Sequence, residues 1–163
     1  MFTRQGFSLF RIGLIIGGIG ILAAIAGGAS FFLDQSSRQV PLDIESYPGA
    51  LPAGRDDLRA NQRRQFFRVV GVEPEPVVEY YQNKMQEFSG ENRDCVRLPA
   101  SGEFPTNRED VVPYEFRCHF DNSGFRSTQY TTVHIQPGVF NSDPARNTEG
   151  MTVIIYEQYW QPR

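Results

Sequence analysis

The strongest constraint on this chain is an uncharged run from Ile12 to Leu33, flanked by Arg11 and Asp34. At about 1.5 Å per residue, an α-helix over this run is about 33 Å long. The hydrocarbon core of a bilayer is about 30 Å thick, so the helix is long enough to cross it. A cleaved signal peptide is the alternative, but its apolar region is usually only about 7–15 residues long. We therefore predict a retained transmembrane helix over residues 12–33 and an uncleaved N-terminus.

The charges around this run predict its orientation. Arg4 and Arg11 precede the run and Asp34 follows it, and basic residues concentrate on the cytoplasmic side of membrane helices. We expect residues 1–11 in the cytoplasm, the helix in a bacterial cytoplasmic membrane, and the C-terminal part in the periplasm or outside the cell. About 130 residues lie beyond the helix, which is enough for one compact domain.

The charge balance of the exported part limits its partners. The chain has 16 basic and 19 acidic residues, and removing Arg4 and Arg11 leaves 14 basic residues beyond the helix against all 19 acidic ones. This acidic balance argues against nucleic acid or an anionic membrane surface as the partner of the exported domain.

Small residues form a continuous seam along the predicted membrane helix. They recur at spacings of four and three and comprise Gly13, Gly17, Gly20, Ala24 and Gly27, whereas the opposite face carries Ile15, Ile19, Leu22 and Ile25. In lipid, small residues let helix backbones approach closely, and packing then drives their association. We expect this seam to dock against other transmembrane helices. The alternative is a plain anchor, because glycine is common in membrane helices in general.

Beyond the helix, the sequence predicts a proline-broken linker over residues 34–54 and one exported α+β domain over residues 55–163. We expect a short helix in RDDLRANQRR (residues 55–64) with a solvated charged face. The next segment, QFFRVVGV, is rich in aromatic and β-branched residues and predicts a strand.

The segment EPEPVVEYYQNKMQEF predicts the one helix of this domain. Its prolines suit a helix start, and Gly90 suits its end. Apolar residues at helical spacing predict a stripe that faces the core, with a ligand groove as the alternative. The stripe consists of Val77, Val78, Tyr81, Met85 and Phe88.

Four later segments predict strands, namely RDCVRL, PYEFRCHF, YTTVHIQ and MTVIIYEQYW. Phe116, Cys118 and Phe120 alternate with polar residues and therefore share one face, and Val133 and Ile135 share the inward face of the next strand. The element order is β-α-β-β-β-β, which predicts an α+β fold with a small antiparallel sheet and one packed helix. The polar loop over residues 141–150 is a candidate contact surface.

The two cysteines, Cys95 and Cys118, both lie in the exported part. In an oxidising compartment a lone pair predicts one disulfide, and an antiparallel pairing of their strands would bring them opposite each other. No CxxC motif or nearby histidine pair favours a metal or redox role.

The sequence gives little sign of catalytic chemistry. His119 and His134, with Asp121 nearby, would permit a surface metal site on the outward face of the sheet, but exposed polar residues are the simpler interpretation. No GxSxG, HExxH or phosphate-binding glycine loop is present. We expect no enzymatic activity, no cofactor and no bound metal.

The N-terminal region resembles that of type IV pilins and pseudopilins. RQGFSL is similar to their short basic leader and processing site, and IGILAAIA is similar to the pilin helix. This resemblance implies cleavage between Gly6 and Phe7. The glutamate that the family carries at the fifth mature position is replaced by Arg11, and Pro41 breaks the helix that pilins continue beyond the membrane.

The exported part resembles small domains of bacterial membrane-anchored or lipoprotein-like proteins. The resemblance rests on YPGA (residues 47–50), the following strand, VVEYY (residues 77–81) and the strands up to Trp160. Single-span subunits with a small exported domain occur in membrane electron-transfer assemblies such as alternative complex III, and the resemblance to these is one of architecture.

These observations favour a non-catalytic, single-pass accessory subunit of a bacterial membrane-protein complex, with a complex that transfers electrons as one candidate. Its partners would be the lipid bilayer and the transmembrane helices of larger subunits. Two alternatives stay open. One is a pilin-like or pseudopilin subunit, and the other is a membrane-anchored ligand-binding or sensory domain that uses the helix stripe or residues 141–150.

Overall fold

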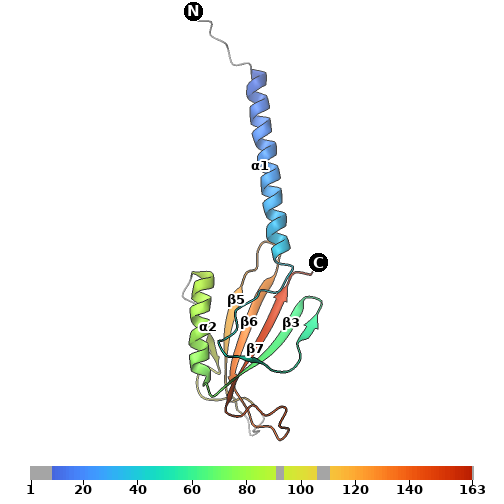
Figure 1. The fold of residues 1–163 in the computed structure, drawn as a ribbon. Helices are drawn as coiled ribbons and strands as arrows, with labels where there is room; N and C mark the ends of the chain where they lie inside the picture. Colours follow the sequence, from blue (N-terminus) through green and yellow to red (C-terminus); the bar gives the residue numbers. More distant parts are fainter. Residues whose placement is uncertain (1–8, 91–93, 106–110, 163) are drawn as a thin grey trace, which may run out of the picture. The chain divides into compact units, whose positions relative to one another are not determined.

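The computed structural model describes residues 9–90, 94–105 and 111–162, and the chain divides into two compact units, Met1–Ser37 and Arg38–Arg163 (Figure 1). The first unit contains the helix α1 (Leu9–Ser37), which extends the uncharged run at both ends. The helix ends before Pro41, as the sequence predicts. In its last turn, the hydroxyls of Ser36 and Ser37 donate to the carbonyls of Leu33 and Asp34, an arrangement in which side chains satisfy groups of the preceding turn.

The second unit is an antiparallel sheet with one helix, α2 (Pro74–Ser89), so the predicted α+β fold is confirmed (Figure 1). In the described residues the sheet has seven strands in the order β1-β3-β7-β6-β5-β4, with β2 paired to β3. The strands are β1 (Leu51–Pro52), β2 (Asp57–Arg59), β3 (Gln62–Val70), β4 (Val96–Leu98), β5 (Glu115–Asp121), β6 (Gln129–Pro137) and β7 (Met151–Trp160).

The last strand lies in the middle of the sheet. β7 pairs along its length with β3 on one side and β6 on the other. Its residues alternate strictly, and the buried set contains Thr152, Ile154, Tyr156, Gln158 and Trp160. A central strand of an antiparallel sheet with one covered face shows this period of two.

The predicted short helix over residues 55–64 was wrong, because this segment forms the hairpin of β2 and the start of β3. Tertiary partners explain the strand. Arg64 forms an ion pair with Glu157 of β7, and the Arg63 Nε donates to the Gln158 side-chain oxygen at 2.6 Å. These side chains alternate between the two faces of the sheet, which a strand permits and a helix does not.

The inner face of the sheet is covered in part by α2. The helix begins at Pro74 and ends at Gly90, whose φ of 67° is the left-handed conformation that glycine favours. The predicted stripe is confirmed as core for Val77, Val78, Tyr81 and Met85. Phe88 differs: it is 42% exposed, and its ring makes an edge contact with the buried Phe120.

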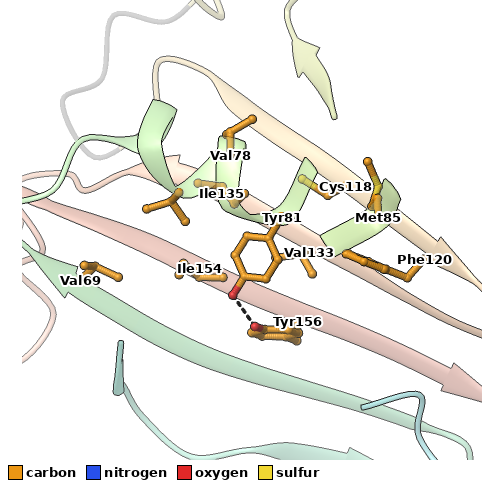
Figure 2. Close-up of a cluster of buried hydrophobic side chains, with 11 residues drawn as sticks. Val69, Val78, Tyr81, Met85, Cys118, Phe120, Val133, Ile135, Ile154 and Tyr156 are labelled. Carbon is orange, nitrogen blue, oxygen red and sulfur yellow. Dashed lines mark hydrogen bonds between the residues drawn. The ribbon is translucent and has the colours of Figure 1, made fainter. Parts of the chain in front are cut away.

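Strand residues complete this core, and Figure 2 shows α2 laying its side chains over them. Four of the residues predicted to face inward are buried and pack together with Val69, Ile154 and Tyr156. They comprise Cys118, Phe120, Val133 and Ile135. The fifth, Phe116, is partly buried and packs against this core.

The rest of the inner face is covered by the segment that follows α1. The sequence predicts a linker over residues 34–54. In the structure, part of this segment belongs to the domain, because four of its residues pack against the core: Leu42, Ile44, Tyr47 and Ala50. The second unit therefore begins at Arg38, whose Nε donates to the Asn122 carbonyl at 2.6 Å.

Buried polar side chains of the sheet hold this segment in place. The Leu42 carbonyl accepts from the Thr131 hydroxyl at 2.6 Å and from the Gln158 amide at 2.7 Å. The Gln129 amide donates to the Val40 carbonyl at 2.9 Å. Polar residues at inward positions thus bind main-chain groups that an apolar face would leave unpaired.

Two hydroxyl groups join α2, β7 and this segment, and Figure 2 shows the hydrogen bond between them, from Tyr81 of α2 to Tyr156 of β7. The Tyr47 N–H donates to the Tyr81 hydroxyl oxygen at 2.9 Å, Tyr81 and Tyr156 share a hydrogen bond, and the Tyr156 hydroxyl donates to the Glu45 carbonyl at 3.4 Å. Burial raises the pKa of Tyr81 to about 12 and also raises the pKa of Tyr156. Both phenols therefore stay protonated at neutral pH and keep their donor roles.

The predicted disulfide between Cys95 and Cys118 is present. It follows from the register of β4 and β5, in which Val96 pairs with Arg117, so that the preceding cysteine faces Cys118. Cys118 is fully buried, and the bond ties the short edge strand to the core.

We predict that Tyr81→Phe destabilises the second unit by about 1–3 kcal/mol, because the buried Tyr47 N–H loses its acceptor. The matched control is Tyr130→Phe, since the Tyr130 hydroxyl makes no hydrogen bond within the described residues, and its ring lies on the outer face against Tyr159. Urea unfolding of the full chain in uncharged detergent, followed by the fluorescence of the single tryptophan, measures the difference. Equal midpoints for the two variants would contradict this role of the hydroxyl chain.

We also predict that replacing both cysteines by alanine lowers the free energy of unfolding by about 3 kcal/mol, because the disulfide restricts the unfolded chain. The same urea titration measures the loss, and treatment of the wild-type chain with reductant should reproduce it. Alkylation of the native, unreduced protein should label neither cysteine. Labelling of both would show that the bond does not form.

Candidate helix-docking face and the other predicted sites

The seam residues Gly13, Gly17, Gly20, Ala24 and Gly27 all lie within α1. At about 100° per residue, they fall within about 40° of one direction on an ideal helix. Ile15, Ile19 and Leu22 lie near the opposite direction and are 55%, 62% and 69% exposed. The helix therefore has a narrow face of small residues and a broad face of bulky ones.

The seam is open to a partner. A Cβ added at Gly13, Gly17, Gly20 or Gly27 would meet no atom within 4 Å outside the helix's own neighbouring backbone. These glycines are therefore not required by packing inside the described chain. Residues Gly13–Ser37 form a helix that is long and apolar enough to cross a membrane.

The stripe of α2 does not form a ligand groove, because Val77 and Tyr81 have no exposed surface and pack on the sheet. The alternative of a groove along this stripe is therefore wrong.

The two histidines lie on the outer face of the sheet, but the register separates them. His134 pairs with Arg117 and His119 pairs with Thr132. The His119 ring contacts the Thr132 hydroxyl and the Tyr130 ring, while the His134 ring lies 3.3 Å from a Glu115 oxygen and 3.5 Å from a Glu157 oxygen. Within the described ranges, no group of three histidine, cysteine or acidic residues is placed to hold a metal ion.

His134 belongs to a charged network that the sequence analysis did not identify. Glu115 pairs with Arg117 and Glu157 pairs with Arg64, so the imidazole lies between two ion pairs. Burial lowers the pKa of His134, while the Glu115 carboxylate opposes this effect. The alternation of residues along β5 and β7 predicts that Glu115, Arg117 and Glu157 face outward. The strand register is needed to show that they lie beside His134.

The loop over residues 141–150 has a defined shape. The Asp143 carboxylate accepts from the Ala145 N–H at 3.0 Å, and its carbonyl accepts from the Arg146 and Asn147 N–H groups at 2.9 Å. Gly138 closes the base of the loop, where a Cβ would collide with the Thr148 carbonyl oxygen. This candidate contact surface is therefore held by its own hydrogen bonds.

Comparisons of the chain with protein families, with curated proteins and with solved structures found no match. The resemblances drawn from the sequence remain predictions. The expected processing site between Gly6 and Phe7 lies outside the described residues.

Proposed function

We propose that this protein is a membrane-anchored, non-catalytic accessory subunit of a larger membrane-protein complex. The observation that carries the proposal is the continuous small-residue face of α1, which the rest of the described chain leaves uncovered at its glycines.

The docking proposal depends on what surrounds α1. Exposed apolar side chains along this helix need lipid or protein around them. In lipid, however, the hydrophobic effect does not bring helices together, and close packing of small residues does. Small residues also occur elsewhere around α1, at Gly18 and Ala26, but the set from Gly13 to Gly27 recurs at spacings of four and three and forms one continuous seam. The face from Gly13 to Gly27 therefore supports docking against transmembrane helices of larger subunits.

The second unit supports a role next to such a partner rather than a role in catalysis. Its inner face is covered by α2 and by the segment after α1, so the residues of this face serve the packing of the unit. The domain would lie in the periplasm or outside the cell and cover an exported surface of the complex. A complex that transfers electrons in a bacterial cytoplasmic membrane fits this architecture.

We predict that the mature chain keeps its N-terminus and carries no N-terminal methyl group. Arg11 replaces the glutamate of pilins, and α1 ends at Ser37 instead of continuing as a long exported helix. Mass spectrometry of the purified membrane protein measures this. A mature chain that starts at Phe7 would favour the pilin-like alternative, and one that starts near Ser30 would show that α1 is a signal peptide.

A second prediction tests the docking face. Gly17→Leu together with Gly20→Leu places bulk on the seam and should reduce co-purification with partner subunits in mild detergent several-fold, because the backbones can no longer approach. The chain itself accommodates both changes, since neither glycine has a neighbour within 4 Å.

The matched control adds similar bulk to the opposite face through Gly18→Leu together with Ala26→Leu. At about 100° per residue, both positions lie more than about 130° from the centre of the seam. Membrane insertion and urea unfolding of the second unit should be unchanged in both double variants. Equal retention of both in the complex would rule out the seam as a docking surface.

A further inference from the structure

A pocket lies near the end of β3 and the start of β7, beside the loop between β6 and β7. Figure 1 shows β3 and β7 side by side in the sheet. Its volume is about 660 Å³, which is within the range of about 300–1,000 Å³ for small-molecule sites. Its walls come from β1 and the turn after it, from β3, from the start of β7 and from the loop over residues 141–150.

The pocket is strongly basic in a chain with a net negative charge. Arg55, Arg68 and Arg146 line it, and among the described residues no aspartate or glutamate does. Arg55 and Arg68 come from neighbouring parts of the chain around the β2–β3 hairpin, and Arg146 comes from the distant loop before β7. A cavity lined by one sign of charge concentrates its field and attracts ligands of the opposite sign.

Two of these arginines are available to bind a ligand. Arg55 and Arg68 have no hydrogen-bond or ion-pair partner within the described part of the chain, whereas Arg64 and Arg117 on the same sheet pair with carboxylates. The strand register explains why Arg68 has no partner, because its neighbours across the sheet are the apolar Leu51 and Val153.

Arg146 forms a weak ion pair that is exposed to solvent. Its Nε lies 3.6 Å from an Asp143 oxygen, and its side chain is 78% exposed. Such an exposed ion pair contributes little and leaves the guanidinium available to a ligand.

The frame that carries these arginines is fixed by main-chain hydrogen bonds. The Ala53 N–H donates to the Phe66 carbonyl at 2.8 Å and holds the turn before Arg55 against β3. On the other side, Asp143 and Thr148 close the loop that carries Arg146. A frame ordered before binding spares a ligand the cost of ordering it.

The remaining wall is apolar and includes Pro52, Phe66 and Val153. Guanidinium groups bind carboxylate and phosphate oxygens through paired hydrogen bonds and stay charged at all physiological pH values. We propose that this pocket binds a small organic anion, in which a carboxylate or phosphate group meets the arginines and an aromatic or other apolar body lies against Phe66. This inference goes beyond the accessory-subunit role and does not depend on the seam.

The test uses the full chain in uncharged detergent and four probes: phenyl phosphate, benzoate, benzyl alcohol and inorganic phosphate. Isothermal titration calorimetry should show binding of phenyl phosphate or benzoate that is stronger than binding of both inorganic phosphate and benzyl alcohol. The comparison of the two organic acids identifies the preferred anion.

Charge-matched variants locate the site. Arg68→Gln and Arg55→Gln should each weaken binding of the better organic acid by about tenfold or more, because each removes a charge-assisted contact. Arg59→Gln makes the same change of charge on β2 outside the pocket, where Arg59 has only an exposed partner, and should leave affinity unchanged. Urea unfolding verifies that all three variants are folded.

Three results would overturn the proposal. The first is that neither organic acid binds at millimolar concentration, which would leave the arginines as a contact for an acidic protein surface. The second is equal weakening by Arg59→Gln, which would indicate a general charge effect. The third is that benzyl alcohol or inorganic phosphate binds as tightly as the organic acids, which would show that the arginines and the apolar wall do not act together.

Discussion

The structure of the second unit depends on the buried contact between Tyr81 and Tyr156. It is the point where three separate parts of the chain meet: α2, the central strand β7 and the segment that follows α1. Each hydroxyl both donates and accepts, so the Tyr47 N–H and the Glu45 carbonyl are satisfied at the two ends of one chain of hydrogen bonds. Because unpaired buried polar groups are costly, this network fixes the position of α2 and of residues 45–47 together.

A second set of polar residues extends this principle along the sheet. Gln129, Thr131 and Gln158 occupy inward positions and bind the carbonyls of Val40 and Leu42. The inner face is therefore divided between a helix that packs by apolar contacts and an extended segment that binds through hydrogen bonds.

The two units differ in where their apolar side chains lie. The second unit buries its apolar residues within its own fold and adds a disulfide at its β4 edge. The first unit presents exposed apolar side chains between Leu14 and Leu33 and is long and apolar enough to cross a membrane, where lipid or other helices would cover them. In the role that we propose, the seam from Gly13 to Gly27 is the face on which a second helix would approach. The arginine-lined pocket adds a separate surface, whose ligand would be recognised by charge and not by burial of apolar area alone.

The sequence by itself determined the features that rest on local periodicity. Alternation identified Phe116, Cys118 and Phe120 as inward and placed the disulfide, and helical spacing between Pro74 and Gly90 identified α2 and its buried face. The uncharged run determined α1, because length and composition alone are enough to make a helix that can span a membrane. These features need no knowledge of distant partners.

Tertiary structure decided the rest, because the deciding partners are far apart in the chain. Residues 55–64 became a hairpin since Arg64 and Arg63 find Glu157 and Gln158 on β7. The segment after α1 became part of the domain because Thr131 and Gln158 bind its main chain. The basic pocket exists only because β1, β3 and the loop before β7 converge at one end of the sheet. Local pattern fixes which face a side chain takes in its own element, whereas the register and the strand order determine what that side chain meets.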